Sequence, residues 1–538
     1  MTPLAAGGGG DLELILFGIL AATGGLVLLA QRTGVPYPIT LTLGGIALAF
    51  VPGVPAVELD PDLVLVLILP PLLYAAAFFS SLRDLRANLR PISLLAVGLV
   101  IATTLTVALV AHTLIDGLSW AAACVLGAVL APTDPVAATA IAGRLGAPRR
   151  ITTVVEGESL INDSTALIAY KFAVAAVVTG GFSVLDAGFE FVYSVAGGIA
   201  IGVVVGAVVG ALRRRTEDPP TEITLSIVSP YLAYLPADAL GLSGVIAAVT
   251  TGIYLGWRAP QLASPTTRLQ AYAVWEILVF SLNAALFVLI GLQLRTATEG
   301  LDGGTDAMTL AGYAAAIIAT VVLTRFAWLF PFTYLPRRLS RRLRGRDPAP
   351  PPSWVLVLGW SGLRGAVSLA AALAIPETTA GGAPFPERDV IVFLTFAVVV
   401  FTVVGQGLTL PLVVRAFDVH DDGGKEAVEE SKARLRAAEA ALRRLDELRT
   451  EGWVRDDTEQ RVRGLYEFRR RRIRARFDAD DDRDGIEARS LDYQRLAREL
   501  LEAQRAEIVA LRGQGRINDE VMRRIERELD LEDNRLEV

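Results

Sequence analysis

The chain has 538 residues, of which 52% are hydrophobic and 20% charged, with a formal net charge of −6, and its mean hydropathy of +0.46 is above that of a soluble globular domain. The single cysteine, Cys124, excludes a disulfide framework, and the two histidines, His112 and His420, leave no material for a histidine-based metal site. These features indicate an all-α polytopic membrane protein and argue against a metalloenzyme. We expect no enzymatic activity, no cofactor and no nucleic-acid partner.

Thirteen apolar runs are long enough to be read as transmembrane helices. In chain order they cover residues 11–31, 37–53, 62–80, 90–115, 119–143, 150–178, 187–211, 222–236, 241–257, 270–296, 307–335, 353–376 and 388–416. The eighth and ninth runs are short, which leaves the count there open by one. No Lys or Arg precedes Arg32, so the first run lacks the basic start of a signal peptide and is expected to remain as a helix.

Basic residues fall in alternate loops, which sets the orientation of the spans. These loops hold Arg32; Arg83, Arg86 and Arg90; Arg144, Arg149 and Arg150; Arg213, Arg214 and Arg215; Arg258 and Arg268; and the cluster from Arg337 to Arg346. The intervening loops are mainly acidic. By the positive-inside rule the basic loops are cytoplasmic. This predicts an N-terminus outside, a C-terminus in the cytoplasm, and an odd number of spans.

Two spans are expected to be interrupted. In the fifth, Pro132 and Pro135 each lack an amide and clash with the preceding turn, so the helix should break around Thr133 and Asp134. The twelfth is loosened by glycines and carries polar residues: Gly359, Ser361, Gly362, Arg364, Gly365 and Ser368. Such paired interruptions are typical of inverted-repeat transporters whose site lies where the broken helices cross. Close packing of small residues is the alternative for the glycines, but it does not require an arginine.

The sixth span carries a polar stripe. At 3.6 residues per turn Glu156, Ser159 and Asp163 share one face, and Glu158 and Asn162 form an adjacent pair. Interhelical hydrogen bonds would explain the serine and the asparagine. A charge at membrane depth, however, costs roughly 2.5 to 3.5 kcal/mol. We therefore interpret Asp163 as a functional carboxylate.

The composition changes after Phe417, from apolar to rich in Glu, Arg, Ala and Leu. We therefore divide the chain into a transmembrane domain, residues 1–417, and a cytoplasmic helical domain, residues 418–538, with a regulatory role. Helices are expected near residues 425–450, 456–478, 484–513 and 517–531. The basic run from Arg469 to Arg476 is read as a solvated helical face, with lipid or nucleic-acid contact as the alternative.

Three motifs together resemble the sodium/proton exchanger branch of the monovalent cation/proton antiporters, in its bacterial form. They are Thr133-Asp134-Pro135, Gly157-Glu158-Ser159-Leu160-Ile161-Asn162-Asp163 and Gly362-Leu363-Arg364-Gly365-Ala366-Val367-Ser368. The resemblance covers about residues 11–417. It implies about thirteen helices in two inverted repeats, a homodimer, and a core centred on residues 90–178 and 307–416. This core would move against a dimerisation subdomain in elevator-type alternating access.

The resemblance also implies roles for single residues. Asp163 would bind the cation or the proton, with Asn162 as its neutral neighbour. Thr133 and Ser159 would offer oxygen ligands to the monovalent cation, and Asp134 would lie near the helix crossing. A structural ion pair is implied between Glu158 and Arg364.

The expected chemistry is competition for one carboxylate. Burial disfavours the charged form of a carboxylic acid in general, so a proton and a hard cation that prefers oxygen ligands can occupy Asp163 alternately. With Asn162 beside it, one group titrates, which predicts one cation per proton and no net charge moved. Relatives with two aspartates here look electrogenic, so this inference is partly taken from the resemblance.

The predicted function is exchange of Na⁺, with K⁺ or Li⁺ as further candidates, for H⁺ across the plasma membrane, in the service of pH homeostasis. One departure bears on the ion. Many prokaryotic relatives carry a glutamate after the third-span sequence Pro70-Pro71-Leu72-Leu73-Tyr74, where this chain has Ala75. A K⁺-selective antiporter is therefore the alternative, followed by a proton-coupled carrier of another solute. The lipid bilayer is the other expected partner.

Overall fold

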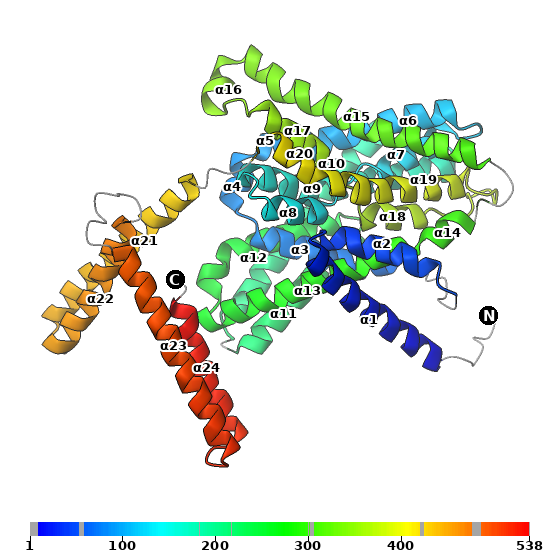
Figure 1. Cartoon of the computed structure of the whole chain (residues 1–538). Helices are drawn as coiled ribbons and strands as arrows, with labels where there is room; N and C mark the ends of the chain where they lie inside the picture. Colours follow the sequence, from blue (N-terminus) through cyan, green and yellow to red (C-terminus); the bar gives the residue numbers. More distant parts are fainter. Residues whose placement is uncertain are drawn as a thin grey trace. The chain divides into compact units, whose positions relative to one another are not determined.

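The computed structural model describes residues 9–52, 59–181, 183–216, 218–299, 301, 306–419, 424–475 and 486–536. Within these ranges the regular structure is helical, apart from an isolated β-bridge between Thr378 and Pro384 (Figure 1). The chain divides into two compact units, residues 1–421 and 422–538. The division lies close to the compositional boundary at Phe417.

The helices of the first unit fall, over the described residues, into thirteen consecutive segments. They are α1 (Gly9–Thr33); α2 (Tyr37–Ala49); η1 and α3 (Leu63–Ile68, Leu69–Phe79); α5, η2 and α6 (Leu89–Ser93, Leu94–Leu99, Val100–Leu114); α7 and α8 (Trp120–Val129, Pro135–Arg144); α9 (Arg149–Thr179); α10 (Val184–Arg213); α11 (Pro219–Ala239); α12 (Gly244–Leu262); α13 (Pro265–Leu292); α15 (Ala307–Leu339); α17 and α18 (Pro352–Trp360, Ala366–Leu373); and α19, η3 and α20 (Arg388–Val400, Phe401–Gln406, Gly407–Ala416). Three short helices join them: α4 (Leu82–Ala87), α14 (Leu294–Glu299) and α16 (Arg341–Arg346).

These segments confirm an all-α polytopic membrane protein. Among the described residues, six helices are long and apolar enough to cross a membrane by length and composition, and three shorter apolar helices accompany them. The segment bounds agree closely with the thirteen predicted runs, including the short eighth and ninth. Figure 1 shows α15 and α6 side by side along one edge of the unit.

Three π-helical turns, η1, η2 and η3, interrupt the third, fourth and thirteenth segments. The apolar pattern did not predict them, because one inserted residue changes the backbone hydrogen bonding but leaves an all-apolar run looking the same. Such insertions are frequent near functional sites. The hydroxyl of Thr402 in η3 accepts a hydrogen bond from the backbone N–H of Arg364 at 3.0 Å, so this turn supports the twelfth segment.

The two expected interruptions are present. α7 ends at Val129 and α8 begins at Pro135, while α17 ends at Trp360 and α18 begins at Ala366. As the fifth and twelfth of thirteen consecutive spans, the broken segments run in opposite directions. Each is flanked by continuous spans, over Leu89–Thr179 and again over Ala307–Ala416. This repeated order fits the predicted pair of inverted repeats.

The backbones of α2 and α13 pack in close contact. Gly45 of α2 and Gly291 of α13 face each other, and an added Cβ at either residue would overlap backbone atoms of the other helix. The contact depends on the missing side chains, because only glycines let two helix backbones come this near.

The second unit consists of α21 (Gly424–Thr450), α22 (Asp456–Ala475), α23 (Ile486–Gly513) and α24 (Asp519–Leu536), close to the four predicted helices. Arg463 of α22 bonds to Glu459 at 2.5 Å and also to Asp446 of α21. Arg474 pairs with Glu439 at 3.5 Å, so part of the basic run contacts acidic partners. Arg476 lies outside the described residues.

Candidate functional site

A cavity of about 500 Å³ lies inside the first unit. One wall comes from α3 and α13, and the other from the α7–α8 connection, α9 and the first turn of α18. The cavity therefore separates segments of the predicted core from segments outside it. Thr133, Asp134, Ser159 and Asp163 all line it.

Asp163 is a buried acidic residue in the wall of this cavity. Its side chain is only 6% exposed and lines the cavity wall, yet it makes no hydrogen bond or ion pair among the residues that the structure describes. A buried carboxylate without a partner is costly at membrane depth. Glu156 and Ser159 line the same cavity, as their spacing on one helical face predicts.

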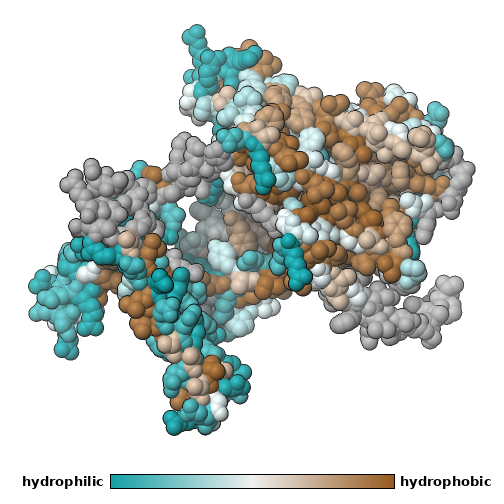
Figure 2. Space-filling view, viewed as in Figure 1, coloured by the Kyte–Doolittle hydropathy of each residue, from teal (hydrophilic) through white to brown (hydrophobic). Residues whose placement is uncertain are grey.

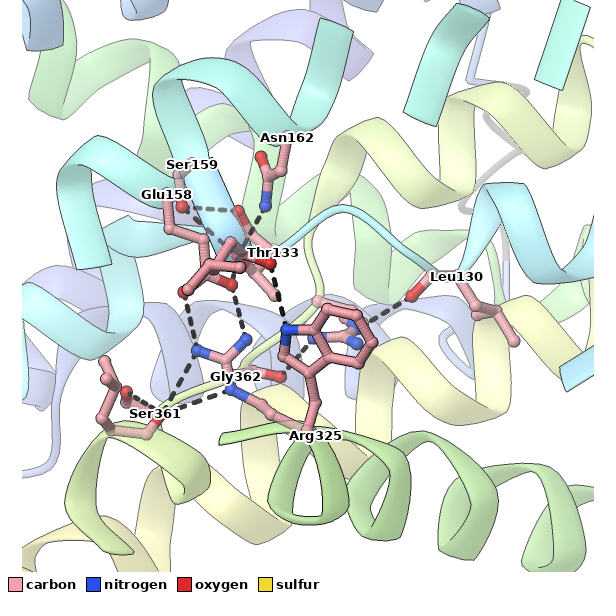
Figure 3. Close-up of polar contacts among 12 residues, drawn as sticks. Leu130, Thr133, Glu158, Ser159, Asn162, Arg325, Ser361 and Gly362 are labelled. Atoms are coloured by element: carbon pink, nitrogen blue, oxygen red, sulfur yellow. Dashed lines mark hydrogen bonds and ion pairs between the residues drawn. The ribbon is translucent and has the colours of Figure 1, made fainter. Parts of the chain in front are cut away.

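Thr133, in the break between α7 and α8, is held by three residues of α9 (Figure 3). Its hydroxyl donates to Glu158 Oε1 at 3.1 Å and accepts from Asn162 Nδ2 at 2.8 Å. Its carbonyl accepts the hydroxyl proton of Ser159 at 2.8 Å. Because the Ser159 proton is used in this way, the lone pairs of its oxygen remain available beside Asp163.

Glu158 is paired with Arg325 of α15, which corrects the predicted pair with Arg364. The Arg325 guanidinium donates to both carboxylate oxygens, at 2.5 and 2.8 Å, and both side chains are almost fully buried. Its Nε also donates to the carbonyl of Leu358 at 3.2 Å. The prediction was wrong because it considered only motif residues and overlooked a single arginine in the eleventh span.

A sequence signal for Arg325 existed. It is the only charged residue between Ala307 and Pro336, and an ionisable residue within a span is functional by default. Membrane depth therefore marks Arg325 as a functional charge in the same way as Asp163.

Arg364 instead donates hydrogen bonds to backbone carbonyls in the two helix breaks. Its Nε donates to the carbonyl of Leu130, the residue that caps the C-terminus of α7, and its Nη1 donates to the carbonyl of Gly362, both at 2.8 Å. Unsatisfied carbonyls at helix C-termini carry partial negative charge, which a buried guanidinium compensates. The residue is thus a structural cation at the crossing.

Asp134 plays the complementary part at the helix starts. Its carboxylate caps α8 by accepting from the N–H of Val136 at 2.8 Å, and its own N–H donates to the carbonyl of Leu363 at 2.8 Å. A Cβ on Gly365 would overlap the Asp134 carboxylate. The two breaks therefore cross in direct contact, as predicted, and the crossing requires glycine at this position.

The outer residues of the site are placed as follows. Ala75 lines the cavity at the position where the expected glutamate is missing, and Glu276 lines it from α13 with its side chain exposed. Asn283 donates to the carbonyl of Val279 at 2.9 Å. Lys171 of α9 pairs with Asp238 at 3.6 Å.

The comparisons agree on one family. The family model for the transmembrane region of sodium/hydrogen exchangers matches residues 18–416. An uncharacterized Na⁺/H⁺ exchanger of Mycobacterium tuberculosis is 38% identical over 528 residues, covering 97% of this chain and 96% of that protein. The Na⁺/H⁺ antiporter ApNhaP of Aphanothece halophytica is 34% identical and covers 81% of each chain.

A relative in Bacillus pumilus, named a sodium, potassium, lithium and rubidium/H⁺ antiporter, is 34% identical over 70% of this chain and 58% of its own length. Among solved structures, the sodium proton antiporter MjNhaP1 from Methanocaldococcus jannaschii superposes with a TM-score of 0.58 at 16% identity, covering 76% of this chain and 99% of that one. This likeness supports the fold. The chain therefore belongs to the sodium/hydrogen exchanger family and is a membrane transporter of monovalent cations and protons, not an enzyme.

Proposed function

We propose that this antiporter exchanges Na⁺ for H⁺ at Asp163. The observation that carries the proposal is a buried carboxylate that faces a cavity of about 500 Å³ without a partner among the described residues. A proton or a cation can neutralise it, and the two exclude each other. The family match and the names of the relatives support sodium as the cation.

The cation ligands that we propose are oxygens already held in place. They are the Asp163 carboxylate, the Ser159 hydroxyl and an oxygen of Thr133, completed by water from the cavity. The Glu158–Arg325 pair and Asn162 orient Thr133 through its hydroxyl, so the site needs little rearrangement when the cation enters. Oxygen ligands suit a hard monovalent cation.

We propose an electroneutral cycle of one cation for one proton. Asn162 carries no charge, and the Asp134 carboxylate is engaged at the start of α8, which leaves Asp163 as the carrier. When loaded in either way the site is close to neutral and can pass apolar surroundings. The membrane potential, worth about 2.3 kcal/mol per charge per 100 mV, then does not drive the exchange.

Elevator-type movement of the core is the proposed route of access. The cavity separates the core from α3 and α13. At the level of Asp163 and beyond, the polar contacts between the core and the other helices include the hydroxyls of Ser164 and Ser243, 2.7 Å apart, and the pair of Lys171 and Asp238. These contacts would break when the site is exposed to the opposite side.

The orientation, location and assembly are part of the same proposal. The alternation of basic loops supports an N-terminus outside and a cytoplasmic C-terminus in the plasma membrane. We propose a homodimer, and a regulatory role for residues 418–538.

A K⁺-selective antiporter is the second candidate. The cavity wall has Ala75 where many prokaryotic relatives carry a glutamate, and the Bacillus pumilus relative is named for potassium as well as sodium. Fewer charged ligands suit a larger and more weakly hydrated ion.

Dye-reported proton flux in proteoliposomes under Na⁺, K⁺ and Li⁺ gradients tests the proposal. Asp163→Asn should abolish exchange while the protein still purifies folded, and Asp116→Asn, which removes an exposed carboxylate, is the matched control. Clamping the voltage with valinomycin, in separate Na⁺ experiments, should leave the rate unchanged. Exchange that persists in Asp163→Asn would contradict the assigned site.

A further inference from the structure

The end of α15 carries the densest basic run of the membrane unit. Residues 337–346 contain six arginines and no acidic residue. Arg338, Arg341, Arg342 and Arg344 are exposed, and hydrophilic residues cover the surface around α16 (Figure 2). A cluster of four to eight basic residues directly after a transmembrane helix attracts anionic lipid headgroups.

A small groove adjoins this run. Its apolar walls come from Leu94 and Leu95 of η2, Trp328 and Phe332 of α15, and Trp354 of α17. Trp328 and Phe332 stack with ring centroids 4.0 Å apart, and the Trp328 indole donates to the Leu94 carbonyl at 3.0 Å. Tryptophan side chains such as Trp328 and Trp354 are enriched at the level of lipid headgroups.

Three arginines, Arg90, Arg150 and Arg337, lie around the mouth of the groove. One acidic residue, Asp347, contacts all three, with Arg150 at 2.6 Å and Arg90 at 3.9 Å. Burial would raise the pKa of Asp347, but the hydrogen bonds and charges of Arg150 and Arg337 lower it overall. Three positive charges against one negative leave a net charge of +2 at the mouth.

Arg90 is the cation with most capacity left. Its contact with Asp347 is long, and its remaining hydrogen bond, to the carbonyl of Phe332, measures 3.5 Å. Its side chain is one third exposed. A phosphate oxygen beside Arg90 would gain a charge-assisted hydrogen bond without displacing a close one.

We propose that this groove binds an anionic phospholipid of the cytoplasmic leaflet. The headgroup phosphate lies between Arg90 and the exposed arginines of α16, and an acyl chain lies against Trp328 and Phe332. The apolar walls favour a phospholipid over free phosphate, because free phosphate has no apolar part to pack against them. The groove is built from the fourth, sixth, eleventh and twelfth segments, so bound lipid ties together the helices that carry Glu158, Asp163 and Arg325.

The test compares the full chain with a variant, Arg90→Gln/Arg341→Gln/Arg342→Gln. The matched control is Arg214→Gln/Arg215→Gln, which removes two exposed arginines elsewhere on the predicted cytoplasmic face. Each protein is titrated in neutral detergent with phosphatidylglycerol, phosphatidylcholine or inorganic phosphate, and both thermal stability and bound lipid by native mass spectrometry are measured.

Phosphatidylglycerol should bind and stabilise the wild type and the control. The triple variant should bind it about fivefold more weakly for each arginine removed, since one basic residue near a headgroup contributes about 1 kcal/mol. Equal phosphatidylglycerol binding by the triple variant would overturn the proposal. So would equal stabilisation of the wild type by phosphatidylcholine or by inorganic phosphate. Proton flux through the protein is measured in a separate experiment. A negative result for lipid binding therefore does not affect the proposed antiport at Asp163.

Discussion

The buried pair of Glu158 and Arg325 offers the sharpest test of the site. Arg325→Gln removes the partner of a carboxylate that is only 1% exposed and that receives hydrogen bonds at 2.5 and 2.8 Å. Breaking a buried pair from one side costs about 3 to 5 kcal/mol, because a charge is left uncompensated. We expect Arg325→Gln and Glu158→Gln each to lower the free energy of unfolding by about that amount.

The double variant Glu158→Gln/Arg325→Gln removes both charges together and should lose much less than the sum of the single losses. The expected coupling is about 2 to 3 kcal/mol, the upper part of the range for residues in contact. Unfolding in mixed micelles with increasing sodium dodecyl sulfate measures each free energy, and proton flux reports whether the Thr133 oxygens are still positioned.

A second double-mutant cycle, between Glu158 and Arg364, serves as the control. Arg364 donates to the backbone carbonyls of Leu130 and Gly362. Glu158→Gln and Arg364→Gln should show a clearly smaller coupling. If the losses at Glu158 and Arg325 were additive, or if Arg364 coupled more strongly to Glu158, the assignment of the ion pair would be refuted.

Three further predictions concern the crossing, the movement and the cytoplasmic end. Gly365→Ala should abolish proton flux, because the added Cβ would overlap the Asp134 carboxylate. Gly312→Ala in α15, where no atom lies within 4 Å of the added Cβ, should leave flux unchanged. Equal flux in the two variants would contradict the contact between Gly365 and Asp134. In a Cys124→Ser background, a short reducible crosslinker between Lys171→Cys and Asp238→Cys should stop exchange until it is reduced, and continued exchange in the linked protein would exclude movement there. Asp347→Asn should lower stability at pH 7; because the folded-state pKa of Asp347 lies below its ordinary 3.8, its contribution is present above that pH and disappears as the pH falls through the lowered pKa. A stability difference that stayed constant while acidification protonated the Asp347 carboxylate would contradict this role.

The sequence by itself determined the spans, their breaks and the polar face of α9. Each of these depends on local chemistry. Apolar length sets a span, a proline without an amide ends a helix at a definite residue, and helical spacing places Ser159 and Asp163 on one side. Arg325 was also recognisable as an intramembrane charge from its own segment.

Tertiary structure alone decided which charges meet. Glu158 and Arg325 are 167 positions apart, and no spacing rule indicates that the guanidinium at that carboxylate comes from α15 and not from Arg364 in the α17–α18 connection. The cavity likewise needs walls from α3, α9, α13 and α18. Partner choice between distant spans depends on how whole helices pack, which a pattern read along one helix does not contain.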